Sequence, residues 1–148
     1  MRSFLAVLPL VLLAGCSSFR PDPENITAVP SDRLLAYQEE RQNGGQLIVN
    51  RDMGLMGGGC YVAIEVDRKL AARIGMAEVA SFQVPAGTRV LGLTLDPLDD
   101  TLCGMGRLHK ELAVKVEPGS VHYFHVVSEN RVGFDLRPDD KPPQVLAQ

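Results

Sequence analysis

Tryptophan is absent from this sequence of 148 residues, and aromatic residues make up only 5% of it. Neither charge is in strong excess, because 15 basic and 18 acidic residues give a net charge of −3 and the isoelectric point is near 5.6. This balance excludes the basic surface with which proteins bind nucleic acid. With 45% hydrophobic and 22% charged residues, the composition is typical of a folded domain rather than a disordered or membrane-embedded chain. The length allows one ordinary domain.

Long apolar runs are also missing, apart from a single one near the amino terminus. It extends from Phe4 to Leu13, follows the positive charge of Arg2 and leads into small residues. The run is shorter than the roughly 20 residues that span a bilayer, and no second run follows it, so it predicts an export signal. The rest of the chain is not expected to cross a membrane.

The residues that close this run, Leu13-Ala14-Gly15-Cys16, resemble the lipobox of bacterial lipoprotein precursors. The resemblance implies that residues 1–15 are removed as a signal peptide and that Cys16 becomes an acylated first residue held in the lipid bilayer. In this class an Asp after the cysteine favours the inner membrane. Because Ser17 stands there, the resemblance implies a lipid anchor in the outer membrane that faces the periplasm. The alternative is an ordinary secretory signal with an incidental cysteine.

Composition divides the remaining chain into a tether, a body and a tail. Residues 16–30 are rich in proline and have no sustained apolar period, which predicts a lipidated tether. Residues 31–45 begin with the cap residue Ser31, contain good helix formers and end in glycine, which predicts one short helix. Residues 138–148 are polar and rich in proline, which predicts a disordered tail.

From Gln46 onward the apolar period changes to two, which predicts strands separated by turns. About eight short strands are expected, within 46–51, 60–66, 70–74, 82–84, 91–95, 112–116, 121–127 and 132–136. Pro118 and Gly119 take the central positions of a type II turn. Strands with one apolar face and no long intervening helices predict an all-β fold, an antiparallel β-sandwich over residues 46–137.

Three stretches of this body resemble a family of uncharacterised bacterial lipoproteins. They are Val-Ala-Ile-Glu-Val-Asp-Arg-Lys-Leu-Ala-Ala-Arg-Ile at 62–74, Phe-Gln-Val-Pro-Ala-Gly at 82–87, and Val-Glu-Pro-Gly at 116–119 before Val-His-Tyr-Phe at 121–124. Members carry a short immunoglobulin-like or PEGA-like β-sandwich with a Val-Asp-Gly-Lys turn and a Pro-Gly-x-His turn. Here Arg68 replaces the usual Gly, and Arg89 stands where His is common. The resemblance implies the fold and the location but no catalytic residues.

Three cysteines are an odd number for an exported chain. Once Cys16 carries lipid, Cys60 and Cys103 remain as a pair in an oxidising compartment, which predicts a disulfide bond. The bridge would close a loop of about 44 residues and stabilise the fold by at most about 4 kcal/mol through chain entropy. It is expected to hold the long connection 96–109.

Methionine and glycine surround both cysteines, which favours a second interpretation. Thioether, thiolate and imidazole groups are the ligands that soft Cu(I) prefers, so the alternative function is a copper-binding lipoprotein using loops 53–60 and 103–109. Its ligands would be Met53, Met56, Cys60, Cys103, Met105 and His109. These cysteines would have to be reduced, and Met beside Gly in a loop is more often a gap-filler. The main expectation is therefore no metal and no cofactor.

Motifs for catalysis are missing as well. No Gly-x-Ser-x-Gly elbow occurs, and the run Gly57–Gly59 lacks the Lys-Ser/Thr pair of a phosphate loop. His122 and His125 stand three apart on a predicted strand, so they point to opposite faces and do not chelate one ion together. The acids within 96–100 are interpreted as a solvated loop rather than a cation site. The sequence therefore predicts that the chain is not an enzyme.

The remaining interpretation is a structural or interaction module whose loops make the contacts. Loops 53–59 and 96–109, held together by the bridge, are rich in Leu and Met beside Gly. The predicted partner surface consists of Leu55, Met56, Leu98, Leu102, Met105 and Leu108. The expected partner is an envelope protein or a glycan. The alternative is that these side chains close the open end of the sandwich.

Overall fold

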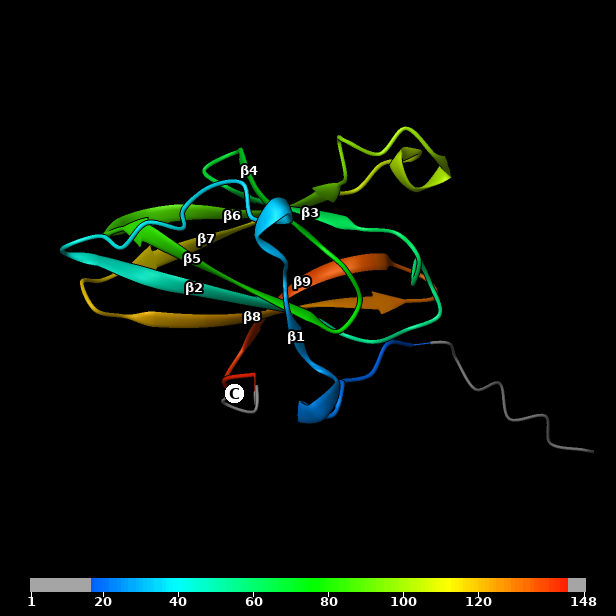
Figure 1. Cartoon of the computed structure of the whole chain (residues 1–148), viewed down its shortest axis with the longest axis horizontal. Coiled ribbons are helices and arrows are strands. Elements are labelled where there is room, and N and C mark those ends of the chain that lie inside the picture. Colours follow the sequence, from blue (N-terminus) through cyan, green and yellow to red (C-terminus); the bar gives the residue numbers. More distant parts are fainter. Residues whose placement is uncertain (1–16, 144–148) are drawn as a thin grey trace, which may run out of the picture.

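The computed structural model describes residues 17–143, whose strands form two sheets packed face to face (Figure 1). One sheet has five strands in the order β1-β5-β2-β8-β9, and the other has four in the order β4-β3-β6-β7. The strands are β1 Thr27–Ala28, β2 Gly44–Arg51, β3 Val62–Val66, β4 Lys69–Ile74, β5 Glu78–Pro85, β6 Gly87–Leu95, β7 His109–Val116, β8 Val121–Glu129 and β9 Gly133–Asp139. Short 3-10 helices are η1 Pro23–Asn25, η2 Ser31–Arg33 and η3 Leu102–Gly104.

The prediction of a two-sheet β-sandwich is confirmed, and its core follows from the period-two pattern. In β2, Leu47 and Val49 are completely buried between the sheets, whereas Ile48 lies on the other face of the strand. Phe82 of β5 and Leu91 of β6 are also completely buried. Removing such a side chain from water contributes about 1.5–3 kcal/mol, so the alternating apolar positions hold the two sheets together.

The prediction that all strands are antiparallel is wrong for the five-stranded sheet, which is mixed. β2 pairs in parallel with β8, and the two-residue β1 pairs in parallel with β5. The period of two reports which face of a strand is buried and not the direction in which the strand runs. Because the β7–β8 connection crosses between the sheets, β8 enters beside β2 from the end at which β2 also begins (Figure 1).

The predicted short helix at 31–45 is wrong as well, since no α-helix occurs between residues 17 and 143. Only η2 is helical there, and Tyr37 and Asn43 have positive φ angles of 61° and 59°. The segment bonds to strands instead: the Tyr37 hydroxyl donates to the Val66 carbonyl at 3.1 Å, and the Gln83 N–H donates to the Tyr37 carbonyl at 2.7 Å. These contacts with the sheets outweigh the local helix propensity.

The described part of the predicted tether, from residue 17, lies against the five-stranded sheet. Ile26 is 9% exposed and Val29 only 4%, and the Val29 N–H donates to the Val79 carbonyl. At the other terminus, β9 continues to Asp139, past the predicted boundary at 137. The signal, Cys16 and the end of the predicted tail, from 144 onward, lie outside the described residues.

Candidate functional site

The strand directions gather several connections at one end of the sandwich. β2, β4, β6 and β8 all end there, and β3, β5, β7 and β9 begin there, so their connections share one end (Figure 1). We call this the loop end, and it comprises residues 52–61, 75–77, 96–108 and 130–132. The opposite end, which carries the connections 67–68, 86 and 117–120, is called the turn end.

The amino-terminal part of the described chain also lies at the loop end. The Ser18 N–H donates to the Ser128 carbonyl at 2.8 Å, and the Ser18 hydroxyl accepts from the Ser128 N–H at 2.8 Å. Phe19 forms a two-way backbone bridge with Met53, at 2.8 and 2.9 Å. We therefore count Ser18 and Phe19 as part of the loop end.

Exposed large apolar side chains concentrate at this end. They are Phe19 (61% exposed), Leu55 (88%), Tyr61 (36%), Met76 (37%), Leu98 (60%), Leu102 (83%), Met105 (70%) and Val132 (55%). Elsewhere in residues 17–143, only Leu35 and Val121 are comparably exposed, each at 43%. Single exposed apolar residues are ordinary, but a concentration at one end of a small domain makes that end a candidate contact surface.

The residues of the predicted partner surface divide into two groups. The side chains of Leu55, Leu98, Leu102 and Met105 project into solvent and therefore do not close the end of the core. Met56 and Leu108 are only half-buried, and Leu108 packs against the core cluster. Sequence reasoning missed the isolated apolar residues such as Phe19 and Val132, because only the strand directions bring them to the same end.

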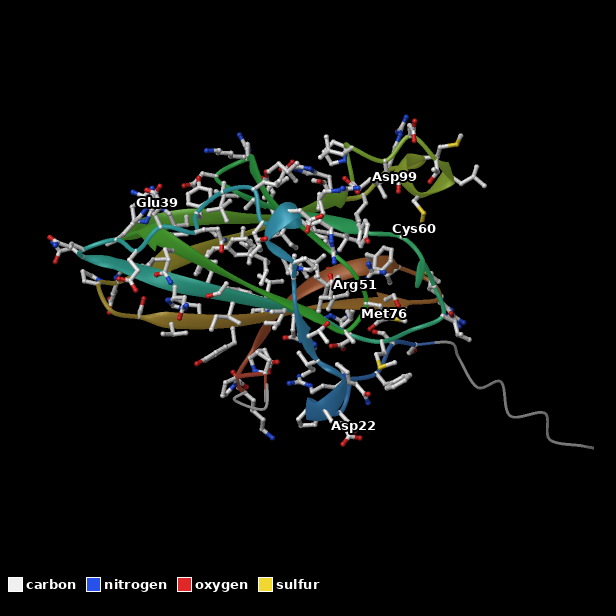
Figure 2. The ribbon with its side chains drawn as sticks, in the orientation of Figure 1. Asp22, Glu39, Arg51, Cys60, Met76 and Asp99 are labelled. Carbon is white, nitrogen blue, oxygen red and sulfur yellow. A yellow bond between two sulfur atoms is a disulfide. The ribbon has the colours of Figure 1, made fainter. Side chains whose placement is uncertain are left out.

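The predicted disulfide between Cys60 and Cys103 is confirmed. Their Cα atoms lie 5.4 Å apart, and the bond ties the β2–β3 connection to η3 in the β6–β7 connection (Figure 2). η3 turns tightly, since a Cβ added at Gly104 would overlap the Asp99 carbonyl oxygen. The bridge therefore joins the two connections that carry the most exposed leucines.

A buried arginine, which the sequence reasoning missed, holds the glycine-rich connection in place. Arg51 is 2% exposed and donates to the carbonyls of Gly57 (2.7 Å), Cys60 (2.6 Å) and Ile74 (3.1 Å). Its guanidinium also lies 4.9 Å from the centre of the Phe134 ring. Burial lowers the pKa of Arg51 to about 10. The sequence did contain a sign of this burial, because Arg51 follows Leu47 and Val49 at a spacing of two and therefore lies on the same inward face of the strand.

Two ion pairs fix the base of the β6–β7 connection and the neighbouring β4–β5 turn. The Asp96 side chain is completely buried and pairs with Arg73 at 2.6 Å, so it is not available to bind a cation. Arg33 pairs with Glu78 through two hydrogen bonds, at 2.5 and 2.7 Å. The Tyr61 ring lies 4.3 Å from the Arg33 guanidinium and 5.1 Å from that of Arg73, which links the two pairs.

Charges that are not buried balance one another at the loop end. They are Asp99, Asp100, Arg107 and Arg131, whereas Asp52 and Asp96 are buried. The hydrogen bonds from the Thr101 hydroxyl and N–H lower the pKa of Asp99, so this carboxylate is ionised and fixed within its own turn. The loop end therefore presents apolar side chains with little net charge.

Three of the proposed soft-metal ligands, Cys60, Cys103 and His109, have another partner in the structure. Cys60 and Cys103 are bonded to each other, which removes both thiolates. The His109 ring lies 3.3 Å from the Glu111 carboxylate and Met105 is exposed, while Met53 belongs to the Phe19 bridge. Across residues 17–143, no group of three or more His, Cys, Asp or Glu side chains could hold a metal ion.

Comparisons with known proteins identify no relative. No family model matches the chain, and no curated protein matches it. In the part of the chain that the structure describes, no helix is long and apolar enough to cross a membrane.

Proposed function

We propose that this chain is a non-enzymatic lipoprotein, anchored through Cys16 in the outer membrane and facing the periplasm, that rests its loop end on the bilayer as an interaction module. The observation that carries this proposal is the position of Ser18, which is bonded to Ser128 at the loop end. An anchor at Cys16, two residues before Ser18 in the sequence, would therefore tether the end of the sandwich that carries the exposed apolar side chains. The resemblance to lipoproteins with an immunoglobulin-like or PEGA-like sandwich supports the same location.

The chain between the anchor and the body is short. Cys16 precedes Ser18 by two residues, which span at most about 7 Å. A Cβ built at Gly54 would lie only 3.2 Å from the Ser18 Cβ, so Ser18 packs against the glycine-rich connection. An acylated Cys16 would therefore hold the loop end close to the bilayer, rather than suspend the body on a long leash.

Lipid is the partner that fits the chemistry of this surface. Transfer of a fully exposed Leu or Met side chain out of water contributes up to about 1.5–3 kcal/mol, and partial insertion contributes part of that. The anchor makes the contact intramolecular, so modest insertion is sufficient. Because acids and bases balance at the loop end, the surface suits zwitterionic headgroups better than a strongly anionic membrane.

Neither of the competing functions is favoured by a particular observation. Copper binding through Cys60 and Cys103 requires two free thiolates, and the disulfide uses both sulfur atoms. Catalysis requires an activated nucleophile or a general acid–base pair, and no catalytic motif occurs in the sequence. The loop end could instead contact an envelope protein or a glycan, and the following experiment distinguishes these partners from lipid.

The experiment places a photoreactive amino acid at Met105 of the full chain in Gram-negative cells. Glu117, whose side chain is 71% exposed at the turn end, is the matched control position. We expect crosslinks from position 105 to yield lipid adducts and crosslinks from position 117 to yield none. A discrete protein or glycan adduct from position 105, without lipid adducts, would overturn the bilayer as partner.

The anchor is tested separately by metabolic labelling with a palmitate analogue. The unmodified chain is expected to incorporate the label, and the Cys16→Ser variant is expected to lose it. Equal labelling of both chains would contradict acylation at Cys16.

A further inference from the structure

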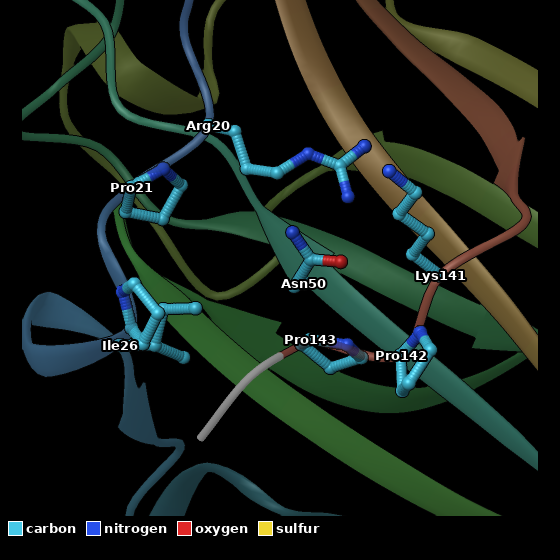
Figure 3. A pocket seen from close by; sticks show the side chains of 8 residues that line it. Arg20, Pro21, Ile26, Asn50, Lys141, Pro142 and Pro143 are labelled. Carbon is cyan, nitrogen blue, oxygen red and sulfur yellow. The ribbon is translucent and has the colours of Figure 1, made fainter. Parts of the chain in front are cut away.

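A small pocket lies on the outer face of the five-stranded sheet, between the amino-terminal segment and the residues that follow β9. Its volume is about 200 Å³. Arg20, Pro21, Pro23, Ile26, Asn50, Lys141, Pro142 and Pro143 line it. Figure 3 shows the Asn50 amide in the middle, with Arg20 and Lys141 on one side and Pro142 and Pro143 on another. None of these residues belongs to the loop end.

Asn50 provides an unpaired hydrogen-bond acceptor at the floor of the pocket. The residue is 2% exposed, and its Oδ1 atom has no hydrogen-bond partner. Its Nδ2 lies 3.5 Å from an Asp52 carboxylate oxygen, which places the amide nitrogen toward Asp52 and leaves the oxygen as the free group. A buried acceptor without a partner costs free energy, so this atom favours a ligand that brings an N–H or O–H donor.

Two cationic side chains stand beside this acceptor. Arg20 donates to Asp139 at 2.7 Å through one terminal nitrogen, which leaves its other N–H groups for a ligand. The Lys141 backbone N–H donates to the same carboxylate at 3.1 Å, so Asp139 fixes both residues. Among residues 17–143, the Lys141 ammonium takes part in no ion pair. The pair favours an anionic group such as a carboxylate.

The remaining walls are apolar and stiff. Proline side chains and Ile26 present carbon atoms without hydrogen-bonding groups, and proline rings fix their own backbone angles. Such walls suit a small aliphatic side chain and not a second charged group. The volume is below that of pockets for drug-sized ligands, which limits the occupant to a small chemical group.

We propose that this pocket binds the carboxyl-terminal residue of a peptide. The terminal carboxylate pairs with Arg20 and Lys141, and the last amide N–H donates to Asn50 Oδ1. A small side chain, such as the methyl group of alanine, contacts the prolines and Ile26. Asn50 Oδ1 requires a hydrogen-bond donor, and the Arg20 and Lys141 side chains require an anion. The carboxyl-terminal residue of a peptide supplies both, because its amide N–H lies next to its carboxylate. This proposal does not depend on the anchor or on the bilayer contact.

The test uses the full chain carrying Cys16→Ser, labelled with 15N in a neutral detergent, and the probe N-acetyl-alanyl-alanine. We expect saturable NMR shifts of the Asn50 side-chain amide and of backbone amides at 20–26 and 139–141, with a Kd of about 1 mM or below. The C-terminal amide of the probe, which lacks the carboxylate, is expected to bind at least about tenfold more weakly. The analogue with a methylated last amide nitrogen tests the bond to Asn50 without altering the protein.

Lys141→Met is expected to weaken binding of the acid about five- to tenfold. Lys115→Met, an exposed lysine outside this pocket, removes the same charge and is the matched control, with no expected change. The proposal is overturned if no saturable shift occurs up to about 10 mM probe. Equal binding of acid, amide and N-methyl analogue, or equal effects of the two lysine variants, would also overturn it.

Discussion

At the scale of single residues, Arg51 is the side chain on which the loop end depends most. An arginine on the inward face of a strand is costly to bury, and within residues 17–143 no carboxylate forms an ion pair with it. Instead it donates to three carbonyls, those of Gly57 and Cys60 in the β2–β3 connection and that of Ile74 at the end of β4. The residue therefore fixes the glycine-rich connection from inside, while the disulfide fixes it from outside.

Replacing Arg51 with Met is expected to lower the free energy of unfolding by about 2–4 kcal/mol, because buried carbonyls lose their donor. Urea denaturation measures this change. Arg131→Met, at an exposed position of the same end, is the control and is expected to stay within about 0.5 kcal/mol of the original chain. A similarly small effect at Arg51 would show that the carbonyls find other donors.

Asp139 makes stability depend on pH in the acid range. Burial by itself raises the pKa of Asp139, but the hydrogen bonds from Arg20 and from the Lys141 N–H outweigh it and hold the pKa below the ordinary value of 3.8. The unfolded chain therefore binds a proton more readily than the folded chain. The stabilisation is complete above the unfolded pKa and is lost as pH falls through the folded pKa.

Asp139→Asn tests this sign. The loss of unfolding free energy caused by the substitution is expected to be larger at about pH 6 than at about pH 3, because the original chain has lost part of its advantage at the lower pH. Asp100→Asn, at an exposed position, is the control. An effect of Asp139→Asn that stays constant between the two pH values would contradict this account.

At the scale of elements, the strands were predictable and their directions were not. Each long strand overlaps a predicted range because its alternation records burial residue by residue, as in Leu47 and Val49. The parallel pairing of β2 with β8 leaves no mark on that alternation. The helix prediction at 31–45 failed because local propensity at Ser31 says nothing of contacts with the sheets, such as the Arg33–Glu78 pair and the bond from Tyr37 to Val66.

The disulfide is the element-scale feature that sequence reasoning identified in full. The double variant Cys60→Ala/Cys103→Ala is expected to lose up to about 4 kcal/mol of unfolding free energy, since the bridge closes a long loop. Hydrogen exchange should show near-complete loss of protection at amides 98–107. Amides of β2 and β8 should lose only the share that follows from the lower global stability.

The opposite pattern of exchange would contradict this division. If the amides of β2 and β8 lost protection to the same extent as those of 98–107 under native conditions, the bridge would be supporting the sheets. The Arg73–Asp96 pair, and not the disulfide bond, would then be the main contact that holds the β6–β7 connection in place.

At the scale of the whole molecule, the defining feature is the difference between the two ends. Leu55, Leu98, Leu102 and Met105 were predictable as a surface because they stand close to the cysteines in sequence. Phe19 and the single exposed apolar residues of other connections could not be predicted as part of this surface. They are far apart in the sequence, and only the strand directions bring them to one end. The turn end carries charged residues at 67–68 and at Glu117, so the sandwich is apolar at one end and polar at the other.

The central claim is that the apolar end faces the membrane that holds the anchor. The most direct measurement places a nitroxide label at position 105 or 117 of the lipidated full chain in zwitterionic bilayers, and compares relaxation by oxygen with relaxation by a water-soluble nickel chelate. The account predicts that the label at 105 is accessible to oxygen and shielded from nickel, whereas the label at 117 shows the reverse. Equal exposure of both labels to nickel would contradict it.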